Sequence, residues 1–308
     1  MTTKKGAIQY DEYKEDFKQS AYKNNFKNLQ GYIDFAQHYL DFVAEHLQAV
    51  IISQNENHYN FYQYDKQGNF QITRPINSNL MYKTDTFSVA STKFIELLTN
   101  MKEVKPTLEI ERQILNNATY TIQQSIGGAL DAVEGGKSNF ARKLNGDLFE
   151  NLIRLIITET GIPAKAGVIR VPVLIDNVEE FKMNYQHDLI IENADEIKLI
   201  GSIKTSSKDR IDKIFIDKFL YNKLTENETP HIAIFLHDVQ RKGRKQENEY
   251  GISGTFLPGH FKGYTVKLNP LDGVYYCDIR PNMRTEKILK DHIKTFDNLL
   301  IDDIWKFL

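Results

Sequence analysis

Between residues 166 and 238, three strand-like segments precede a helical segment and a further strand, and this order most constrains the fold. The segments AGVIRVPVLI, FKMNYQHDLII and EIKLIGSIK are rich in β-branched and aromatic residues and are separated by short polar turns. Residues 211–224 carry apolar side chains at helical spacing, and HIAIFLHD follows as a strand apolar enough to be buried. The pattern predicts an α/β fold with a mixed sheet flanked by helices.

The first part of the chain has a different pattern. Residues 9–47 carry apolar and aromatic side chains at helix-like intervals, which predicts helices. AVIIS and the two runs that flank Lys66-Gln67-Gly68-Asn69 predict a short strand and a hairpin. Because the pattern shifts near Pro106, we expect a mainly helical N-terminal region with a small β-hairpin over 1–105 and a second, α/β domain over 106–308.

The remaining segments predict further elements of the second domain. Helical spacing recurs over residues 107–134 and 139–159, with glycines or a proline near each end. ISGTF, YTVKL and VYYCDI predict short strands, and residues 285–308 predict one C-terminal helix. SSKD at 206–209 has the form of a capping box, which predicts that the helix over 211–224 starts there.

Composition excludes several classes of protein. The single cysteine, Cys277, rules out a disulfide framework and a cysteine-rich zinc site. No run of about 18 apolar residues occurs and the N-terminus is charged, so we expect a cytoplasmic protein with no membrane partner. The net charge of −2 neither favours nor excludes nucleic acid. EGGKS at 134–138 lacks the first glycine of a phosphate-binding loop, since Asp131 stands there.

An acidic residue and a lysine on neighbouring strands form the main candidate site. Asp188 precedes the apolar end of one strand, and Lys204 ends the next strand after a short turn, so antiparallel pairing brings both to one rim. A carboxylate that holds a hard divalent cation, beside an ammonium group, suits phosphodiester hydrolysis. Each residue also has an alternative, non-catalytic interpretation. Asp188 is then a strand-edge acid that makes a turn contact, and Lys204 is a lysine whose ammonium extends from the sheet edge to solvent.

The layout around this pair, with Ser-Ile-Lys-Thr-Ser-Ser-Lys-Asp-Arg at and beyond the end of the second strand, resembles the PD-(D/E)xK nucleases, in particular type II restriction endonucleases, over about residues 138–240. Two positions depart from the family pattern. His187 stands where proline is usual before the first acid, and Ser202 stands where the acid two residues before the lysine is usual. The resemblance is closest to a subset in which that acid has moved to the following helix, which here assigns Asp217 and a second lysine, Lys208.

The resemblance implies a PD-(D/E)xK restriction-endonuclease-like core that binds Mg²⁺ through Asp188, Asp217 and the carbonyl of Ile203. Glu150, in the helix before the core, is implied as a ligand of a second ion, and Lys204 as the group that positions the attacking water. Asp217 is alternatively an exposed helical residue paired with Lys213, and Glu150 one paired with Arg154.

Two groups of cations are candidates for DNA contact. The densest cluster follows the buried strand HIAIFLHD and comprises the four cations Arg241, Lys242, Arg244 and Lys245, directly after Gln240. Phosphate contact is the functional interpretation, with Gln240 and Arg241 able to read base edges, and a solvated turn is the alternative. Arg142 and Lys143 either clamp phosphate or solvate the first turn of their helix.

Together these features predict a type II restriction endonuclease that hydrolyses both strands of double-stranded DNA at a short, palindromic sequence. Cutting both strands requires two sites related by a two-fold axis, so we expect a homodimer or a tetramer of dimers. A restriction enzyme also implies a cognate methyltransferase in its host. The alternatives are a repair or junction-resolving nuclease with the same core, and a non-catalytic DNA-binding module in which Asp188 and Lys204 form only an ion pair.

Overall fold

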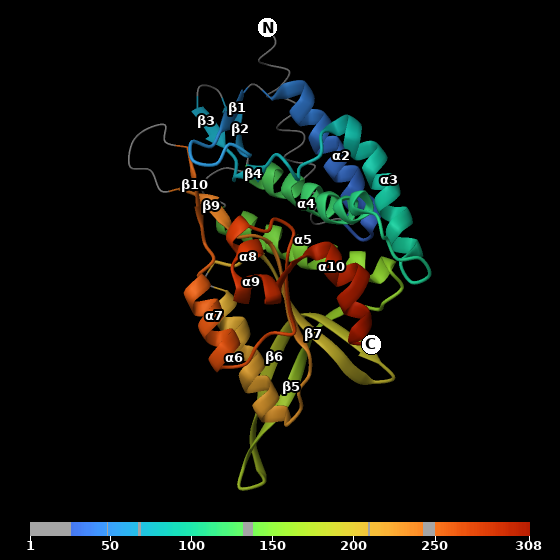
Figure 1. Cartoon of the computed structure of the whole chain (residues 1–308), viewed down its shortest axis with the longest axis vertical. Coiled ribbons are helices and arrows are strands. Elements are labelled where there is room, and N and C mark those ends of the chain that lie inside the picture. The colour runs from blue at the N-terminus through green and yellow to red at the C-terminus, as the bar shows by residue number, and fades with distance from the viewer. Residues whose placement is uncertain (1–25, 48, 67–68, 132–137, 209, 243–249) are drawn as a thin grey trace. The chain divides into compact units, whose positions relative to one another are not determined.

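The structure is a computed structural model that describes residues 26–47, 49–66, 69–131, 138–208, 210–242 and 250–308 (Figure 1). The chain divides into two compact units, each made of three separate segments. Unit 1 comprises Met1–Glu96, Gln113–Leu152 and Val239–Gly254, and unit 2 comprises Leu97–Arg112, Ile153–Asp238 and Thr255–Leu308. These units are made of interleaved segments, whereas the sequence predicted one domain boundary near residue 105. That domain boundary stays a prediction.

Unit 1 combines helices with two small antiparallel sheets. Its elements are α2 (Leu29–His46), most of α3 (Thr84–Asn100) and α4 (Glu109–Asp131), the first part of α5 (Ser138–Glu159), β1 (Ala49–Ile52), β2 (Tyr59–Lys66), β3 (Asn69–Ile72), β4 (Ile76–Asn77), β9 (Val239–Arg241) and β10 (Ile252–Gly254). The predicted hairpin is confirmed, because β2 pairs with β3 and Lys66 lies opposite Asn69. Val239 and Ile252 of the second sheet pack against Tyr59 and Phe61 of β2.

Unit 2 is built on a six-stranded mixed sheet with the order β12-β11-β8-β7-β6-β5. Its strands are β5 (Lys165–Ile175), β6 (Val178–Asn193), β7 (Glu196–Ser206), β8 (His231–His237), β11 (Gly273–Tyr276) and β12 (Ile293–Thr295). β5, β6 and β7 pair in antiparallel fashion, whereas β7, β8, β11 and β12 are parallel. Every residue of β8 is buried, as expected for a central parallel strand.

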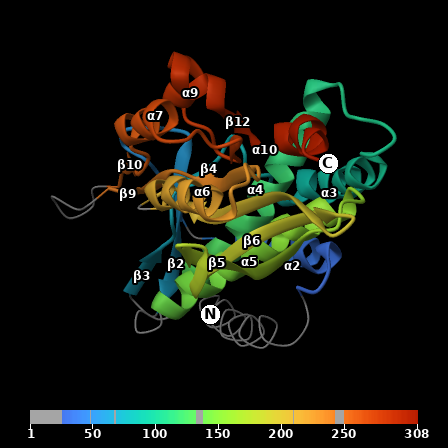
Figure 2. The ribbon, with the colours of Figure 1, turned by 90° about the horizontal axis from the view of Figure 1, so that it is seen from below.

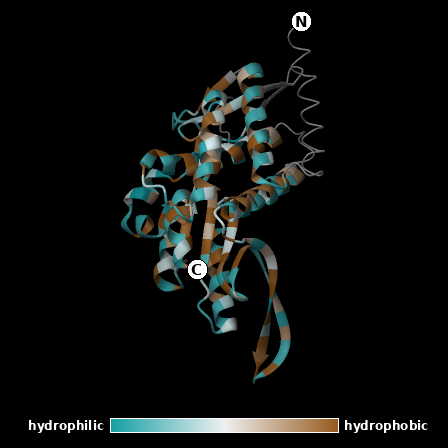
Figure 3. Ribbon diagram, turned by 90° about the vertical axis from the view of Figure 1, so that its right-hand side faces the viewer, coloured by the Kyte–Doolittle hydropathy of each residue, from teal (hydrophilic) through white to brown (hydrophobic). Residues whose placement is uncertain are grey.

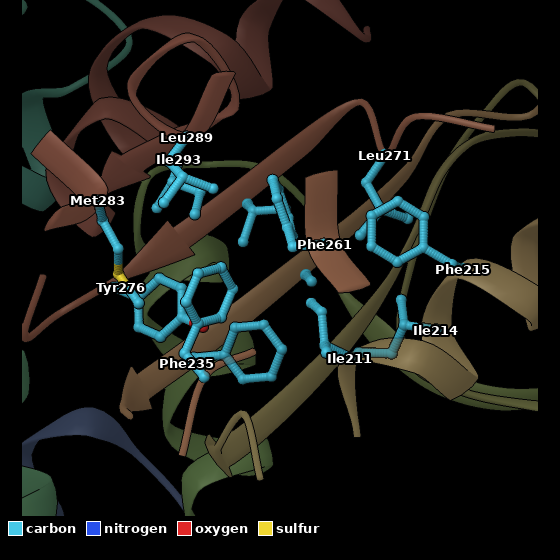
Figure 4. Packing of buried hydrophobic residues seen from close by; sticks show 13 residues of the cluster. Ile211, Ile214, Phe215, Phe235, Phe261, Leu271, Tyr276, Met283, Leu289 and Ile293 are labelled. Atoms are coloured by element: carbon cyan, nitrogen blue, oxygen red, sulfur yellow. The ribbon is translucent and has the colours of Figure 1, made fainter. Parts of the chain in front are cut away.

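Helix α6 (Ile211–Thr225) covers one face of this sheet (Figure 2). Ile211, Ile214 and Phe215 lie at helical spacing and pack against side chains of β8 and β11 (Figure 4). The cluster also includes residues of the C-terminal segment, Phe256, Phe261, Leu271, Met283, Leu289 and Ile293. Burial of this apolar face fixes the position of α6 on the sheet. Because Asp217 belongs to this helix, its backbone position is fixed as well.

The β5–β6 hairpin extends well beyond the rest of the sheet (Figure 1). Asp176 and Asn177 have φ angles of 50° and 65°, the conformation of a two-residue type I′ hairpin turn. Near its base the hairpin packs against Tyr221 of α6. Toward its tip the apolar side chains of Val178 and Phe181 are 60% and 54% exposed, and Figure 3 shows hydrophobic and hydrophilic segments alternating along it.

Two predictions for the C-terminal part of the chain were wrong. YTVKL lies mainly in helix α7 (Pro258–Lys267), because Pro258 starts the helix and Phe261 and Thr265 are buried one turn apart, which outweighs strand propensity. Residues 285–308 do not form one helix. Helices α8 (Pro281–Thr285) and α9 (Lys287–His292) precede β12, which pairs in parallel with β11 and so gains ladder hydrogen bonds, and short helical turns follow over residues 296–306.

The predicted capping box is not formed as expected. Helix α6 begins at Ile211 with Arg210 as its N-cap residue, and that cap makes no side-chain hydrogen bond. Ser206 Oγ instead accepts from Lys208 N, because β7 continues through Ser206 and leaves a turn before the helix. Asp209 lies outside the described residues.

None of the described helices combines the length and apolar composition needed to cross a bilayer.

Candidate active site

Strands β6 and β7 separate at Asp188, and this fork positions the candidate site. Ladder pairing between the two strands extends from the turn as far as Leu189, opposite Gly201. Strand β7 then continues beside β8 until Ser206 lies opposite His237. The two-residue turn at Ala194 and Asp195, whose φ angles are 49° and 64°, sets this register. The end of β7 therefore leaves its β6 side open to side chains.

The carboxylate of Asp188 bridges the fork. Its Oδ2 accepts a hydrogen bond from Ile203 N at 2.9 Å and lies 2.5 Å from Lys204 Nζ. The side chain of Asp188 is 11% exposed and that of Lys204 is 31% exposed. The antiparallel geometry predicted from the sequence is confirmed. Because the carboxylate is largely buried and paired with a half-exposed cation, the pair has one side open to solvent.

Arg154 of α5 contacts the main chain of Asp188, whereas Ile203 and Lys204 contact its side chain. The β5–β6 register shifts between Gly167, opposite His187, and Lys165, opposite Ile190, so Asp188 and Leu189 form a bulge. Arg154 Nη1 donates to the Asp188 carbonyl oxygen at 2.8 Å. The sequence analysis did not assign Arg154 to the site. Its only sequence signal was its spacing of four residues from Glu150.

Two buried histidines lie beside the acidic residues. The rings of His187 and His231 are 5.8 Å apart, and His231 Nε2 lies 3.3 Å from Ser202 Oγ. Burial lowers the pKa of His231 to about 3, and the nearby His187, Lys218 and Lys213 also lower it. Both rings are therefore held in apolar surroundings that favour the neutral form. The sequence indicated only that His187 replaces the usual proline.

Asp217 of α6 and Asp188 both affect the pKa of the same histidine, His187. Burial lowers the pKa of His187, while the carboxylates of Asp188 and Asp217 both raise it. Asp217 also raises the pKa of Tyr185, after the larger effect of burial. Asp217 Oδ2 lies 2.6 Å from Lys213 Nζ, so the alternative ion pair predicted from the sequence is present. The structure thus places both carboxylates within electrostatic range of one imidazole ring.

The other predicted residues lie on separate elements. Lys208 is exposed in the turn before α6. Arg142, Lys143 and Glu150 belong to the part of α5 in unit 1, and Lys143 Nζ lies 2.5 Å from Asp147 Oδ2. Gln240, Arg241 and Lys242 are exposed on and after β9, also in unit 1, while Arg244 and Lys245 lie outside the described residues. Their roles stay predictions.

The donors in unit 2 suit a hard cation. Within the described residues, no three His, Cys, Asp or Glu side chains gather closely enough to hold a metal ion. Mg²⁺, however, often binds through one or two carboxylates and completes its shell with water and substrate phosphate. Asp188 supplies an oxygen donor of that kind at the end of β7, and Asp217 supplies a second one from α6. Both carboxylates raise the pKa of His187, and the chemistry of two carboxylates fits a hard cation such as Mg²⁺.

Comparisons with known proteins identify the fold. No family model and no curated protein sequence matches the chain. The crystal structure of the type IIP restriction endonuclease Kpn2I is similar, with a TM-score of 0.71 and 17% identity, over 96% of this chain and 97% of that chain. The chain has a restriction-endonuclease fold. The complex of the restriction endonuclease PspGI with substrate DNA also matches, with a TM-score of 0.38 and 14% identity over 72% of this chain and 92% of that chain.

In this restriction-endonuclease fold, the expected strand-turn-strand-helix layout is β6, β7 and α6. Asp188 and Lys204 lie at the fork of that layout, and Asp217 lies on the helix that follows. An identity of 17% supports the topology alone, so the roles of these residues rest on the geometry described above.

Proposed function

We propose that the chain is a Mg²⁺-dependent type II restriction endonuclease of the PD-(D/E)xK superfamily, in the subset whose second acid lies on the following helix. It hydrolyses both strands of double-stranded DNA at a short palindromic sequence. The observation that carries the proposal is the 2.5 Å contact between Asp188 and Lys204 at the strand fork of a restriction-endonuclease fold. A partly buried acid beside a partly exposed lysine suits phosphate chemistry.

Asp188, Asp217 and the carbonyl oxygen of Ile203 are the proposed ligands of Mg²⁺, and Glu150 is the proposed ligand of a second ion. When bound, Mg²⁺ neutralises charge on the phosphate and makes water a better nucleophile. Ile203 N already donates to Asp188 Oδ2, which holds the carboxylate at the end of β7. Lys213 pairs with Asp217 and is exposed, so it can release that carboxylate at little cost.

Lys204 is the proposed group that orients the attacking water and stabilises the developing charge. Its ammonium is fixed by Asp188 but keeps access to solvent, since the side chain is 31% exposed. In the proposed reaction, the water oxygen bonds to phosphorus while the bond from phosphorus to the 3′-oxygen breaks, which leaves a 3′-hydroxyl and a 5′-phosphate. One proton of the attacking water passes to solvent, and the leaving 3′-oxygen takes up a proton from solvent. Lys208 is proposed to assist from the turn that follows β7.

DNA binding is proposed for the exposed cations of unit 1. Gln240, Arg241 and Lys242 are exposed; the first two pair with β10, and Lys242 N donates to the Gly251 carbonyl oxygen at 2.8 Å. A two-stranded ribbon suits contact with a groove of duplex DNA. Arg244 and Lys245 would extend this cluster, and Arg142 and Lys143 would add phosphate contacts from α5.

Because both strands of a palindrome must be cut, the proposed enzyme acts as a homodimer or a tetramer of dimers. A host that carries such an enzyme needs a cognate methyltransferase to protect its own DNA. The proposed location of the enzyme, the cytoplasm, gives it access to both the host DNA and incoming DNA.

Incubation of the purified chain with phage DNA in Mg²⁺ or in EDTA, followed by gel electrophoresis, tests the proposal. Discrete bands that require Mg²⁺ are expected. A smear, or cutting of branched DNA alone, would indicate a repair or junction-resolving nuclease. Intact DNA that is nevertheless bound would indicate a non-catalytic DNA-binding module.

A further inference from the structure

We propose that Arg154 is a positioning residue, which sets the orientation of Asp188 for metal binding by holding the Asp188 carbonyl oxygen. This inference rests on the proposed function of Asp188. The contact that carries it is the hydrogen bond of 2.8 Å from Arg154 Nη1 to the Asp188 oxygen. Both residues belong to unit 2, and they are 34 residues apart in the chain.

The position of Asp188 in the sheet explains why it needs such support. Ladder pairing with β7 begins one residue later, at Leu189. On the other side, the bulge places Asp188 and Leu189 in the interval where the register with β5 shifts. A peptide at such a position lacks the regular restraint that a ladder provides. A donor from a neighbouring element therefore has a large influence on the direction of the Asp188 side chain.

Arg154 is suited to supply that donor. The neighbouring residues Ile153, Ile156 and Ile157 of α5 are fully buried, so the helix gives the arginine a fixed base. The guanidinium is planar and presents its donors in a rigid fork, which restrains an acceptor more tightly than an ammonium does. A charged donor also makes a stronger hydrogen bond than a neutral one.

Asp188 is then held at both ends. Arg154 restrains its main chain, while Ile203 N and Lys204 Nζ restrain Oδ2. Such partners of a metal ligand fix the direction of its lone pairs before the ion arrives. Removing Arg154 leaves Oδ2 with its two partners but frees the peptide to rotate, so the ligand becomes less well organised without leaving the site.

Arg154→Ala and Arg154→Lys test the proposal, with Arg170→Ala as a matched control because Arg170 is exposed on β5. Three quantities are compared: the single-turnover cleavage rate, the Kd for cognate DNA without metal, and the affinity for Mn²⁺ measured by electron paramagnetic resonance without DNA. Loss of a partner of this kind typically lowers activity or metal affinity by about 10–100-fold. We expect that loss in Arg154→Ala, a smaller one in Arg154→Lys, and wild-type DNA binding in both.

A purely structural role would give a different pattern. It would lower the folded fraction and DNA binding together, and leave the Mn²⁺ affinity of the folded fraction at the wild-type value. That result, or behaviour of Arg154→Ala like that of Arg170→Ala, would overturn the proposal. If the wild-type chain binds Mn²⁺ but cuts no DNA, the proposed function fails, while the Mn²⁺ affinities still decide the role of Arg154. If the wild-type chain binds no Mn²⁺, the positioning role is overturned as well.

Discussion

Lys204 Nζ lies 2.5 Å from Asp188 Oδ2 across the point at which β6 separates from β7. The pair brings together two residues that are 16 positions apart in the chain. Their side chains differ in exposure, with 11% for Asp188 and 31% for Lys204, so the lysine is the more accessible of the two to solvent. The greater exposure of Lys204 leaves its ammonium group accessible to a substrate phosphate.

Lys204→Ala is expected to abolish cleavage and to leave sequence-specific DNA binding nearly intact. The change removes the cation proposed to orient water and stabilise charge, and the loss of one such group typically costs roughly a hundredfold or more in rate. Single-turnover cleavage and gel-shift titration in Ca²⁺ measure the two effects separately. Lys198→Ala is the control, because Lys198 lies on the same strand and pairs with Glu196. Equal cleavage by both variants would remove Lys204 from the mechanism.

Asp217→Ala is expected to abolish cleavage if the carboxylate is a metal ligand. Lys213→Ala separates this role from the ion pair, since it breaks the pair but keeps the carboxylate. We expect Lys213→Ala to cut at close to the wild-type rate, because an exposed pair contributes little to stability, about 0–1 kcal/mol. Near-normal cleavage by Asp217→Ala would transfer the ligand role to Glu150, and Glu150→Gln would then be inactive.

Loss of cations from the basic segment over residues 241–245 is expected to weaken DNA binding and reduce its dependence on salt. In the double variant Arg241→Ala and Arg244→Ala, each lost phosphate contact should lower the slope of log K against log salt by about 1. Fluorescence anisotropy between low and moderate salt measures the slope. Lys267→Ala, on the exposed side of α7, is the control. An unchanged slope in the double variant would exclude phosphate contact by these arginines.

His231 is expected to make the protein less stable in acid. Its pKa is about 3 in the folded chain against 6.5 for a free histidine, so the unfolded chain binds more protons between these values. The free energy of unfolding therefore falls as pH drops below 6.5, by at most about 1.4 kcal/mol per pH unit from this group. Urea unfolding at pH 7 and pH 5 measures the fall.

The variant His231→Gln isolates this contribution, since carboxylates also titrate in acid. Its free energy of unfolding should fall less between pH 7 and pH 5 than that of the wild type. An equal fall in His231→Gln and wild type would show that His231 does not resist protonation in the folded chain.

The central layout was predictable because local pattern and tertiary structure agree there. β6, β7 and α6 follow directly from the apolar spacing of their residues, and the short turn at Ala194 and Asp195 forces antiparallel pairing. That pairing brought Asp188 and Lys204 together, as the sequence predicted. The Asp217 ion pair was also predictable, because residues four apart on a helix are neighbours.

Elements that depend on distant contacts were not predictable. Thr265 and Val266 have high strand propensity, but Pro258 and the burial of Phe261 place them in α7. β12 exists because residues 293–295 add to the edge of β11, and nothing in the local pattern indicates that partner. The contact of Arg154 with Asp188 depends on the bulge in β6, which a sequence alone does not reveal.

Sequencing of the DNA ends produced by the wild-type chain and by Asp188→Asn, purified in parallel, tests the central claim most directly. Asn keeps the size of the side chain and removes the negative charge at the strand fork. We predict that every wild-type end falls at one short sequence on both strands, and that Asp188→Asn produces no ends while it still binds the same DNA. Ends scattered over many sequences, or the same ends from Asp188→Asn, would contradict the account.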